Sequence, residues 1–315
     1  MPELFLTIFF ISILLLFLGS GVWVAISMIG VSSIGMLIFT TRPVGDAMAT
    51  TIWGTSSSWT LTALPLFVWM GEILFRTKLS ENLFKGLAPW MSRLPGGLIH
   101  VNVVGCALFA AISGSSAATV ATVGKMSIPE LRKRNYPEKL LLGSLAGSGT
   151  LGLLIPPSII LIIYGVTAHV SIKDLFIGGL IPGIILSLAV AGYSIFQGYS
   201  QHVERQPFHL KKILAELKNS YLEAIIPLLI LFGVFGGYTT LVETAAVVVI
   251  YIFIVEVFVY KDLQMKEIPR IIIDCATLIG GVLIILGVAM GLTSYIVDAQ
   301  IPMLLMEWVQ QTITS

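Results

Sequence analysis

The sequence predicts an all-α polytopic membrane protein, and three observations support this fold class. Hydrophobic residues make up 56% of the 315-residue chain and charged residues only 11%, whereas a soluble domain has about 25% charged residues. Several apolar segments are longer than the ~20 residues that a membrane-crossing helix needs. These segments show no period-two alternation of apolar and polar residues, so we expect helices rather than barrel strands.

The remaining composition excludes several other classes. The net charge is +1, and no basic patch stands apart from the loops, so we expect no nucleic-acid partner. Cys106 and Cys275 lie in apolar segments without a disulfide or metal-binding pattern, which predicts buried free thiols. The N-terminal apolar stretch lacks a basic region and a small-residue cleavage site, so we interpret it as a retained span.

Basic residues are concentrated in four loops, which hold sixteen of the eighteen Lys and Arg residues. Short cytoplasmic loops collect Lys and Arg, so the sequence predicts that all four loops lie inside. The N-terminus and residues 40–59 would then lie outside. The basic residues are Arg76, Lys78, Lys85 and Arg93; Lys125, Arg132, Lys133, Arg134 and Lys139; Arg205, Lys211, Lys212 and Lys218; and Lys261, Lys266 and Arg270.

The number of apolar segments between these loops allows all four loops to lie on the inside. We expect an inward span at 60–75, and an outward and a returning span at 140–166 and 175–199. A second outward-and-back pair follows at 221–236 and 240–260, and a last outward span at 271–297.

Residues 96–124 do not fit two ordinary crossings. Predicted inside loops flank this segment on both sides, yet it is shorter than the ~40 residues that two crossings need. Its middle, Ser113-Gly114-Ser115-Ser116, disfavours a helix interior and favours a tight turn. The sequence therefore predicts a re-entrant helical hairpin. Non-helical backbone inside a membrane must face protein or a water-filled cavity, and secondary transporters build their sites from such elements.

A second motif, Gly147 to Ser158, interrupts the predicted span 140–166. Its two prolines, Pro156 and Pro157, lack N–H groups and release carbonyls from the helix. Together with hydroxyls of the hairpin turn, these carbonyls form an all-oxygen environment that suits sodium as a coupling ion, and we expect no other cofactor. The predicted cation-binding residues are Ser113, Ser116, Gly149, Thr150, Gly152, Ile155 and Pro156.

The two half-helix N-termini beside these motifs would present positive dipole ends to an anionic substrate. The predicted substrate-binding residues are Ser115, Ala117, Pro157 and Ser158. One such cluster alone is explained better by small residues that let membrane helices pack closely. Two clusters together, one in a predicted re-entrant turn and one beside Pro-Pro, favour a site. Among the ionisable residues, we expect Glu72 to have an interfacial or helix-packing role rather than a role in coupling, and Glu243 to cap a helix.

Both motifs, and the residues that precede them, resemble one transporter family. The segments Leu64 to Phe67, Met70 to Leu74, Leu87 to Trp90 and Leu94 to Gly97 are similar to the large membrane subunit of tripartite ATP-independent periplasmic (TRAP) transporters. Thr240 to Ala246, which includes Glu243, is also similar to that family. The resemblance spans essentially the whole chain, and Gly-Thr-Leu-Gly followed by Ile-Pro-Pro-Ser is its most specific part.

The resemblance implies an elevator-type, sodium-driven secondary transporter in the bacterial inner membrane. It also implies two partners, a soluble periplasmic substrate-binding protein and a small four-helix membrane subunit. The imported substrates would be organic anions such as C4-dicarboxylates, sialic acid or similar carboxylates. Members of the family have a second, inverted repeat with its own hairpin, and this chain ends soon after that repeat begins. We therefore expect the second repeat to be incomplete and the chain not to catalyse uptake alone.

The resulting domain prediction has four parts. Scaffold helices occupy 1–59, and the first transport repeat occupies 60–199, with the hairpin at 96–124 and the broken helix at 140–166. A cytoplasmic loop and helix pair follow at 200–270, and the start of the second repeat at 271–315.

Three alternatives remain from the sequence. Related divalent-anion/sodium symporters share the hairpin plan but use no binding protein, and an ion channel would also span the membrane. An intramembrane serine protease is the third, because Ala111 to Gly114 resembles a rhomboid serine loop. That chemistry needs a general base near Ser113. The candidates, His100 and His169, do not lie on a companion helix of the expected kind, so we expect no enzyme.

Overall fold

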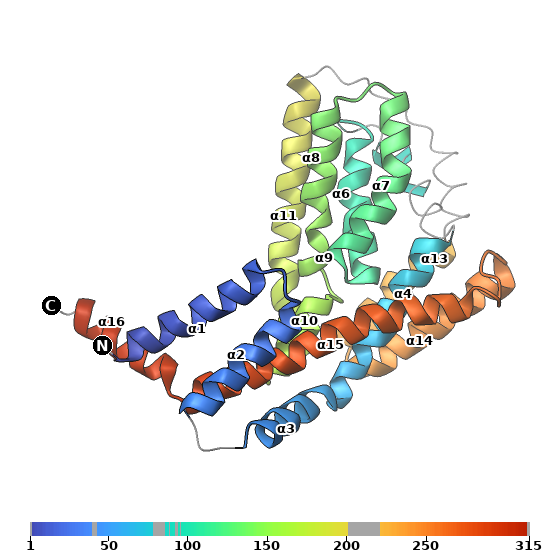
Figure 1. Cartoon of the computed structure of the whole chain (residues 1–315). Helices are drawn as coiled ribbons and strands as arrows, with labels where there is room; N and C mark the ends of the chain where they lie inside the picture. The colour runs from blue at the N-terminus through green and yellow to red at the C-terminus, as the bar shows by residue number, and fades with distance from the viewer. Residues whose placement is uncertain are drawn as a thin grey trace. The chain divides into compact units, whose positions relative to one another are not determined.

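The structure is a computed structural model that describes residues 2–39, 43–77, 86–87, 89–91, 94, 96–200 and 221–313. Within these ranges all regular elements are helices and there is no strand (Figure 1). Four of the described helical segments are long and apolar enough to cross a membrane: Glu138–Thr167, Ile172–Tyr199, Leu241–Val259 and Ile268–Asp298. The bent pair Val44–Ser56 and Trp59–Arg76 makes a fifth if it counts as one span. The predicted all-α polytopic membrane fold class is confirmed.

The chain divides into two compact units, and the first comprises Met1–Trp59 and Thr277–Ser315. Its helices are α1 (Pro2–Gly19), α2 (Val24–Phe39), α3 (Val44–Ser56), most of α15 (Ile268–Asp298) and α16 (Ile301–Ile313). Their core is made of Phe10, Val31, Met36, Met48, Val288, Tyr295 and Ile301. Glycines permit the close packing, since a methyl group at Gly291 would lie 2.8 Å from the Met48 sulfur.

The second unit, Thr60–Ala276, contains the hairpin and the broken helix. In Figure 1, helices α6, α7, α8 and α11 lie side by side in this unit. Its elements are η1 (Trp59–Thr62), α4 (Ala63–Arg76), α6 (Ile99–Ser113), α7 (Ser116–Lys133), α8 (Glu138–Gly149), α9 (Leu151–Leu154), α10 (Ile159–Thr167), α11 (Ile172–Ser200), α13 (Tyr221–Ile230), η2 (Leu231–Phe235), α14 (Leu241–Ile254), η3 (Val255–Val259) and the start of α15.

Helix α6 is central to this unit, since ten of its fifteen residues are buried, among them the polar His100, Asn102 and Ser113. Its buried residues pack against α7 and α8 in a core that includes Val101, Leu131 and Leu141. One buried polar contact crosses the same interface, where the Asn102 side-chain amide donates to Ser144 Oγ at 3.0 Å. These contacts pack the hairpin against α8, the first part of the broken helix.

Most described spans begin and end within three residues of the predicted bounds, and two larger differences occur. Helix α7 continues to Lys133, beyond the predicted hairpin end at 124, because the basic residues that suggested a loop fit on its exposed face. There Arg132 pairs with Glu138 across the turn to α8. The helices in 221–236 and 240–260 each end in a π-helical segment, η2 and η3, which the apolar pattern did not indicate.

Some predictions fall outside the described residues. They include the placement of the basic residues Lys78, Lys85, Arg93, Arg205, Lys211, Lys212 and Lys218. Whether the α6–α7 hairpin enters the membrane without crossing it stays a prediction.

Candidate functional site

The turn of the α6–α7 hairpin is formed by residues whose backbone preferences suit the end of one helix and the start of the next. Gly114 ends α6 in the left-handed conformation, at φ 62°, which glycine adopts at little cost. Ser115 then caps α7, and its Oγ accepts a hydrogen bond from the Ala118 N–H at 3.4 Å, as N-cap serines commonly do. The predicted tight turn is therefore present, with one helix ending and another beginning at its centre.

Hydroxyl groups tie the two arms of the turn together. Thr119 Oγ1 donates to the Ser115 carbonyl at 2.7 Å and lies 3.2 Å from Ser113 Oγ. Ser113 and Thr119 are both buried. Thr119 was not among the predicted site residues. The sequence offered a signal for it, because Ser116 and Thr119 are three residues apart and therefore lie on one face of the helix.

The helix opposite the turn is interrupted at the two prolines. Helix α9 ends at Leu154, and the Ile155 N–H still reaches the Leu151 carbonyl at 2.8 Å. Pro156 and Pro157, joined by a cis peptide bond, have no N–H to donate to the carbonyls of residues 152 and 153. Helix α10 resumes at Ile159 after the buried Ser158. The predicted break is thus present at the predicted residues.

The hairpin turn packs directly on this break. The Ile159 N–H donates to the Gly114 carbonyl at 3.2 Å. A methyl group at Gly114 would lie 2.4 Å from the Pro157 oxygen, and one at Gly152 would lie 2.8 Å from the Ser116 nitrogen. Only glycine allows the two backbones to approach this closely. The structure therefore brings together the two motifs that are 30 or more residues apart in the sequence.

Helix α11 supports the break from another side, again through glycines. A methyl group at Gly179 would lie 2.7 Å from the Leu154 oxygen, and one at Gly183 would lie 3.1 Å from Ile155 Cγ1. The interrupted backbone is thus enclosed by protein, as non-helical backbone inside a membrane requires.

Three hydroxyl groups beside the interface are buried without a hydrogen-bond partner in the described part of the chain: those of Ser116, Ser148 and Ser158. An unpaired buried polar group costs about 1–3 kcal/mol, and its presence in a native protein calls for an explanation such as a bound ion or water. Ser148 was not among the predicted site residues, although it lies within the Gly147 to Ser158 motif.

The other predicted site residues differ in their surroundings. Gly149 is buried and leaves room for the Val120 side chain. Thr150 is exposed, and its hydroxyl donates to the Gly147 carbonyl of its own helix at 2.7 Å. Ala117 is exposed beside the turn, while Pro156 and Pro157 are buried. The assignment of these residues to cation or substrate binding stays a prediction.

Comparison with known proteins decides the family. The sequence model described as "Tripartite ATP-independent periplasmic transporter, DctM component" matches residues 10–315. The chain belongs to this family. The match covers both units and includes every predicted site residue of the DctM-type chain.

Named relatives support the same assignment. The C4-dicarboxylate TRAP transporter large permease protein DctM of Pseudomonas aeruginosa is 31% identical over 84% of this chain and 62% of its own length. The corresponding protein of Vibrio cholerae is 32% identical over 77% of this chain and 54% of its own length. The sialic acid TRAP transporter permease protein SiaT of Haemophilus influenzae is 33% identical over 71% of this chain and 36% of its own length. The DctM-family chain therefore spans between about a third and two thirds of these relatives.

The comparison also settles what kind of protein the DctM-family chain is. Its relatives are named as transporter permeases, and such proteins are not enzymes. The protease alternative is therefore excluded, and the chain is a multi-pass membrane protein.

Two ionisable residues of this DctM-family chain have structural partners. Glu243 and Thr240 form a reciprocal cap at the start of α14, with the Thr240 N–H 2.8 Å from Glu243 Oε2, which confirms the expected capping role. Glu72 pairs with Arg76 at 2.7 Å, and Arg76 also pairs with Asp274 at 2.5 Å. Glu72 therefore belongs to an ion cluster that joins α4 to the start of α15, which agrees with the expected role in helix packing.

Proposed function

We propose that this chain forms the membrane-embedded transport unit of a sodium-coupled, binding-protein-dependent secondary transporter. Its site would lie where the hairpin turn packs on the Pro-Pro break, and its substrates would be organic anions imported across the bacterial inner membrane. The observation that carries the proposal is the set of three buried, unpartnered hydroxyls at that contact, on Ser116, Ser148 and Ser158.

Sodium fits the chemistry of this contact. The hydroxyls of Ser116, Ser148 and Ser158, with the carbonyls of Gly152 and Ile155 beside the prolines, offer neutral oxygen ligands only. Neither motif contains a carboxylate, whereas hard divalent cations favour carboxylate oxygens. A neutral oxygen site would bind a monovalent ion weakly and reversibly, as coupling requires. Ser113 would act indirectly, because its hydroxyl lies against Thr119 and holds the turn.

An organic anion fits the two helix N-termini beside the same contact. Helix α7 begins at Ser116 and helix α10 at Ile159, and a helix N-terminus attracts negative charge through its dipole and its free N–H groups. Ser115, Ala117, Pro157 and Ser158 surround these two ends and would contact the substrate. Relatives are named for C4-dicarboxylates, sialic acid, isethionate and 2,3-diketo-L-gulonate, which are small organic anions. Another is named for ectoine and 5-hydroxyectoine, which are zwitterions that also carry a carboxylate.

Two partners complete the proposal. A periplasmic binding protein would deliver the anion, and a small four-helix membrane subunit would pack beside the permease. The family description itself names a tripartite periplasmic transporter, which supports both partners for this chain.

The experiment uses the complete permease that carries this sequence, reconstituted in liposomes with its small subunit and binding protein. Uptake of radiolabelled succinate and sialic acid is measured under an inward sodium gradient and under an equal choline gradient. We expect saturable uptake of at least one anion with sodium, none with choline, and none when the binding protein is left out. Equal uptake in sodium and choline would contradict the sodium coupling.

The same assay separates the remaining alternatives. Sodium-dependent uptake that persists without the binding protein would identify a divalent-anion/sodium symporter. Discrete single-channel currents in a planar bilayer, without saturation, would identify a channel.

A further inference from the structure

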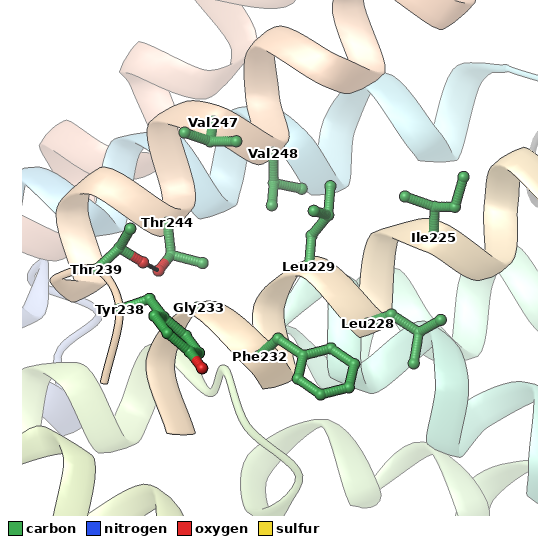
Figure 2. A pocket seen from close by; sticks show the side chains of 10 residues that line it. All are labelled: Ile225, Leu228, Leu229, Phe232, Gly233, Tyr238, Thr239, Thr244, Val247 and Val248. Atoms are coloured by element: carbon green, nitrogen blue, oxygen red, sulfur yellow. Dashed lines mark hydrogen bonds between the residues drawn. The ribbon is translucent and has the colours of Figure 1, made fainter. Parts of the chain in front are cut away.

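A second feature of the Thr60–Ala276 unit is an apolar groove between α13–η2 and α14. It encloses about 290 Å³. Figure 2 shows Leu228, Leu229 and Phe232 on one helix and Val247 and Val248 on the other, with the groove between them. The two threonines that line the groove form a hydrogen bond with each other, since Thr239 Oγ1 and Thr244 Oγ1 lie 2.7 Å apart. The groove therefore suits an occupant that needs no hydrogen bonds.

The groove opens toward the surroundings of the unit rather than into its core. Phe232 is 66% exposed and Val247 is 52% exposed, whereas Val248 at the base is fully buried. The opening coincides with the π-helical segment η2 and with Gly233, where a methyl group would lie 2.8 Å from Thr244 Oγ1. The sequence predicts membrane spans at 221–236 and 240–260, so we expect this open apolar side to face the hydrocarbon of the membrane.

The length of the groove matches part of one bilayer leaflet. From Ile225 to Phe232 the helix rises by about 10 Å, and half of the hydrocarbon core is about 15 Å thick. One end of the groove is the α13–α14 connection, where Tyr238 is 83% exposed. An exposed tyrosine beside a span is typical of the membrane–water interface, so the groove runs inward from that interface.

A basic side chain lies at this interfacial end. The ammonium of Lys173, in the first turn of α11, would be 3.7 Å from a methyl group on Gly237, the neighbour of Tyr238. Among the described residues, Lys173 forms no ion pair or hydrogen bond through its side chain. It is also one of two basic residues outside the four predicted cytoplasmic loops. A positive charge thus stands at the mouth of an apolar groove.

We propose that this groove binds one acyl chain of an anionic phospholipid, with the lipid phosphate paired to Lys173. The apolar lining accounts for the chain, and the free ammonium at the interface accounts for the headgroup. A helix of a partner protein fits less well, because a helical segment about 10 Å long and about 10 Å across occupies roughly 800 Å³. This inference does not depend on the sodium site or on the proposed transport activity.

The test uses the full chain in nanodiscs made from equimolar phosphatidylethanolamine and phosphatidylglycerol. After release from the nanodisc, native mass spectrometry counts the phosphatidylglycerol molecules that the protein retains. Lys173→Gln should lower that retention about fivefold, which corresponds to the ~1 kcal/mol that one Lys contributes near anionic lipid. Lys266→Gln removes another exposed lysine, which follows η3 at the end of α14 opposite to Tyr238; it is the matched control and should retain the wild-type amount.

A second pair of variants tests the acyl-chain site without changing charge. Val247→Trp fills the groove and should abolish retention, whereas Ile250→Trp, at a similarly exposed position on α14, should not. Retention that is unchanged in both Lys173→Gln and Val247→Trp would overturn the proposal. Loss in Val247→Trp alone would overturn the headgroup contact.

A photoreactive amino acid at position 247 identifies the occupant directly, without requiring either variant to fold normally. Irradiation in native membranes should attach a phospholipid to the chain. Attachment to a second polypeptide instead would show that a protein partner fills the groove and would also overturn the proposal.

Discussion

Two interruptions of apolar helices in the same unit have opposite properties. At the first, the Pro156–Pro157 break, the hairpin turn packs on the interrupted helix, and three neighbouring hydroxyls are buried without partners among the described residues. At the second, the connection between α13 and α14, the threonine hydroxyls pair with each other and an apolar groove stays open. Both interruptions arise from clusters of Gly, Thr, Ser or Pro within apolar sequence.

The difference shows that a cluster of helix-breaking residues does not by itself define a polar site. The break becomes a candidate ion site because a second non-helical segment, Ser113 to Ser116, packs on it through glycine contacts. Beside that packing, the hydroxyls of Ser116, Ser148 and Ser158 are buried without hydrogen-bond partners among the described residues. The α13–α14 connection has no such partner segment among the described residues, so its polar groups are satisfied locally and its surface stays apolar.

The largest expected effect concerns the side of the membrane on which the loops next to the two interruptions lie. In a background with Cys106→Ala and Cys275→Ala, Tyr238→Cys should react completely with an impermeant maleimide added to intact cells, because the α13–α14 connection is predicted outside. Arg134→Cys, in the turn between α7 and α8, should not react, and neither should Lys212→Cys. Asp46→Cys should react as a second outside position. Labelling of Arg134→Cys from outside would reverse the predicted orientation.

The next effect concerns the close contact between turn and break. Gly152→Ala places a methyl group within 2.9 Å of the Ser115 and Ser116 backbone, and backbone atoms cannot move aside cheaply. Overpacking of this kind costs about 1–3 kcal/mol, so thermal unfolding in detergent should occur at a clearly lower temperature. Gly143→Ala is the matched control, because no atom lies within 4 Å of the added group. Equal unfolding temperatures for the two variants would show that the contact is loose.

A smaller effect is expected when a proposed cation ligand is removed. In the complete transporter, Ser116→Ala should raise the sodium concentration for half-maximal uptake roughly tenfold, as the loss of a ligand worth about 1–2 kcal/mol requires. Ser113→Ala should raise it less, because the Ser113 hydroxyl lies against Thr119. Ser187→Ala, whose hydroxyl donates to the Gly183 carbonyl within α11, should leave it unchanged. If all three variants have the wild-type sodium dependence, the serines only pack the turn.

The smallest effect lies at the second interruption. Thr240→Ala removes the reciprocal cap of α14 and should destabilise the protein by about 1 kcal/mol. Glu243→Gln keeps an acceptor for the Thr240 N–H and should cost less. Chemical unfolding monitored by circular dichroism measures both. A loss in Thr240→Ala no greater than that in Glu243→Gln would mean that the cap contributes little.

The sequence predicted much of this architecture because its strongest signals are local. The apolar composition required helices, Gly114 within a run of serines required a turn, and Pro156 with Pro157 required a break. Glu243 directly after Thr240-Leu241-Val242 indicated a cap, and the structure forms it.

Other features depend on tertiary contacts that a sequence does not display. The rotation of three helices about their axes decides which hydroxyls form hydrogen bonds. The hydroxyl of Ser113 lies against that of Thr119, whereas those of Ser116 and Ser148 stay unpaired. The length of α7 was underestimated because charge was used to place its end, although charged residues fit well on an exposed helix face. The π-helical segments η2 and η3 have no simple sequence signal, so the groove beside η2 could not be expected.

The most direct test of the central claim is a sodium titration of the purified complete permease, with choline keeping the ionic strength constant. A ligand that binds only the folded protein raises its stability in proportion to the logarithm of ligand concentration above Kd. The unfolding temperature of the wild-type protein should therefore rise with sodium, and the rise should begin at a higher sodium concentration in Ser116→Ala. An unfolding temperature that is the same in sodium and in choline would contradict a sodium site at the hairpin turn and the Pro-Pro break.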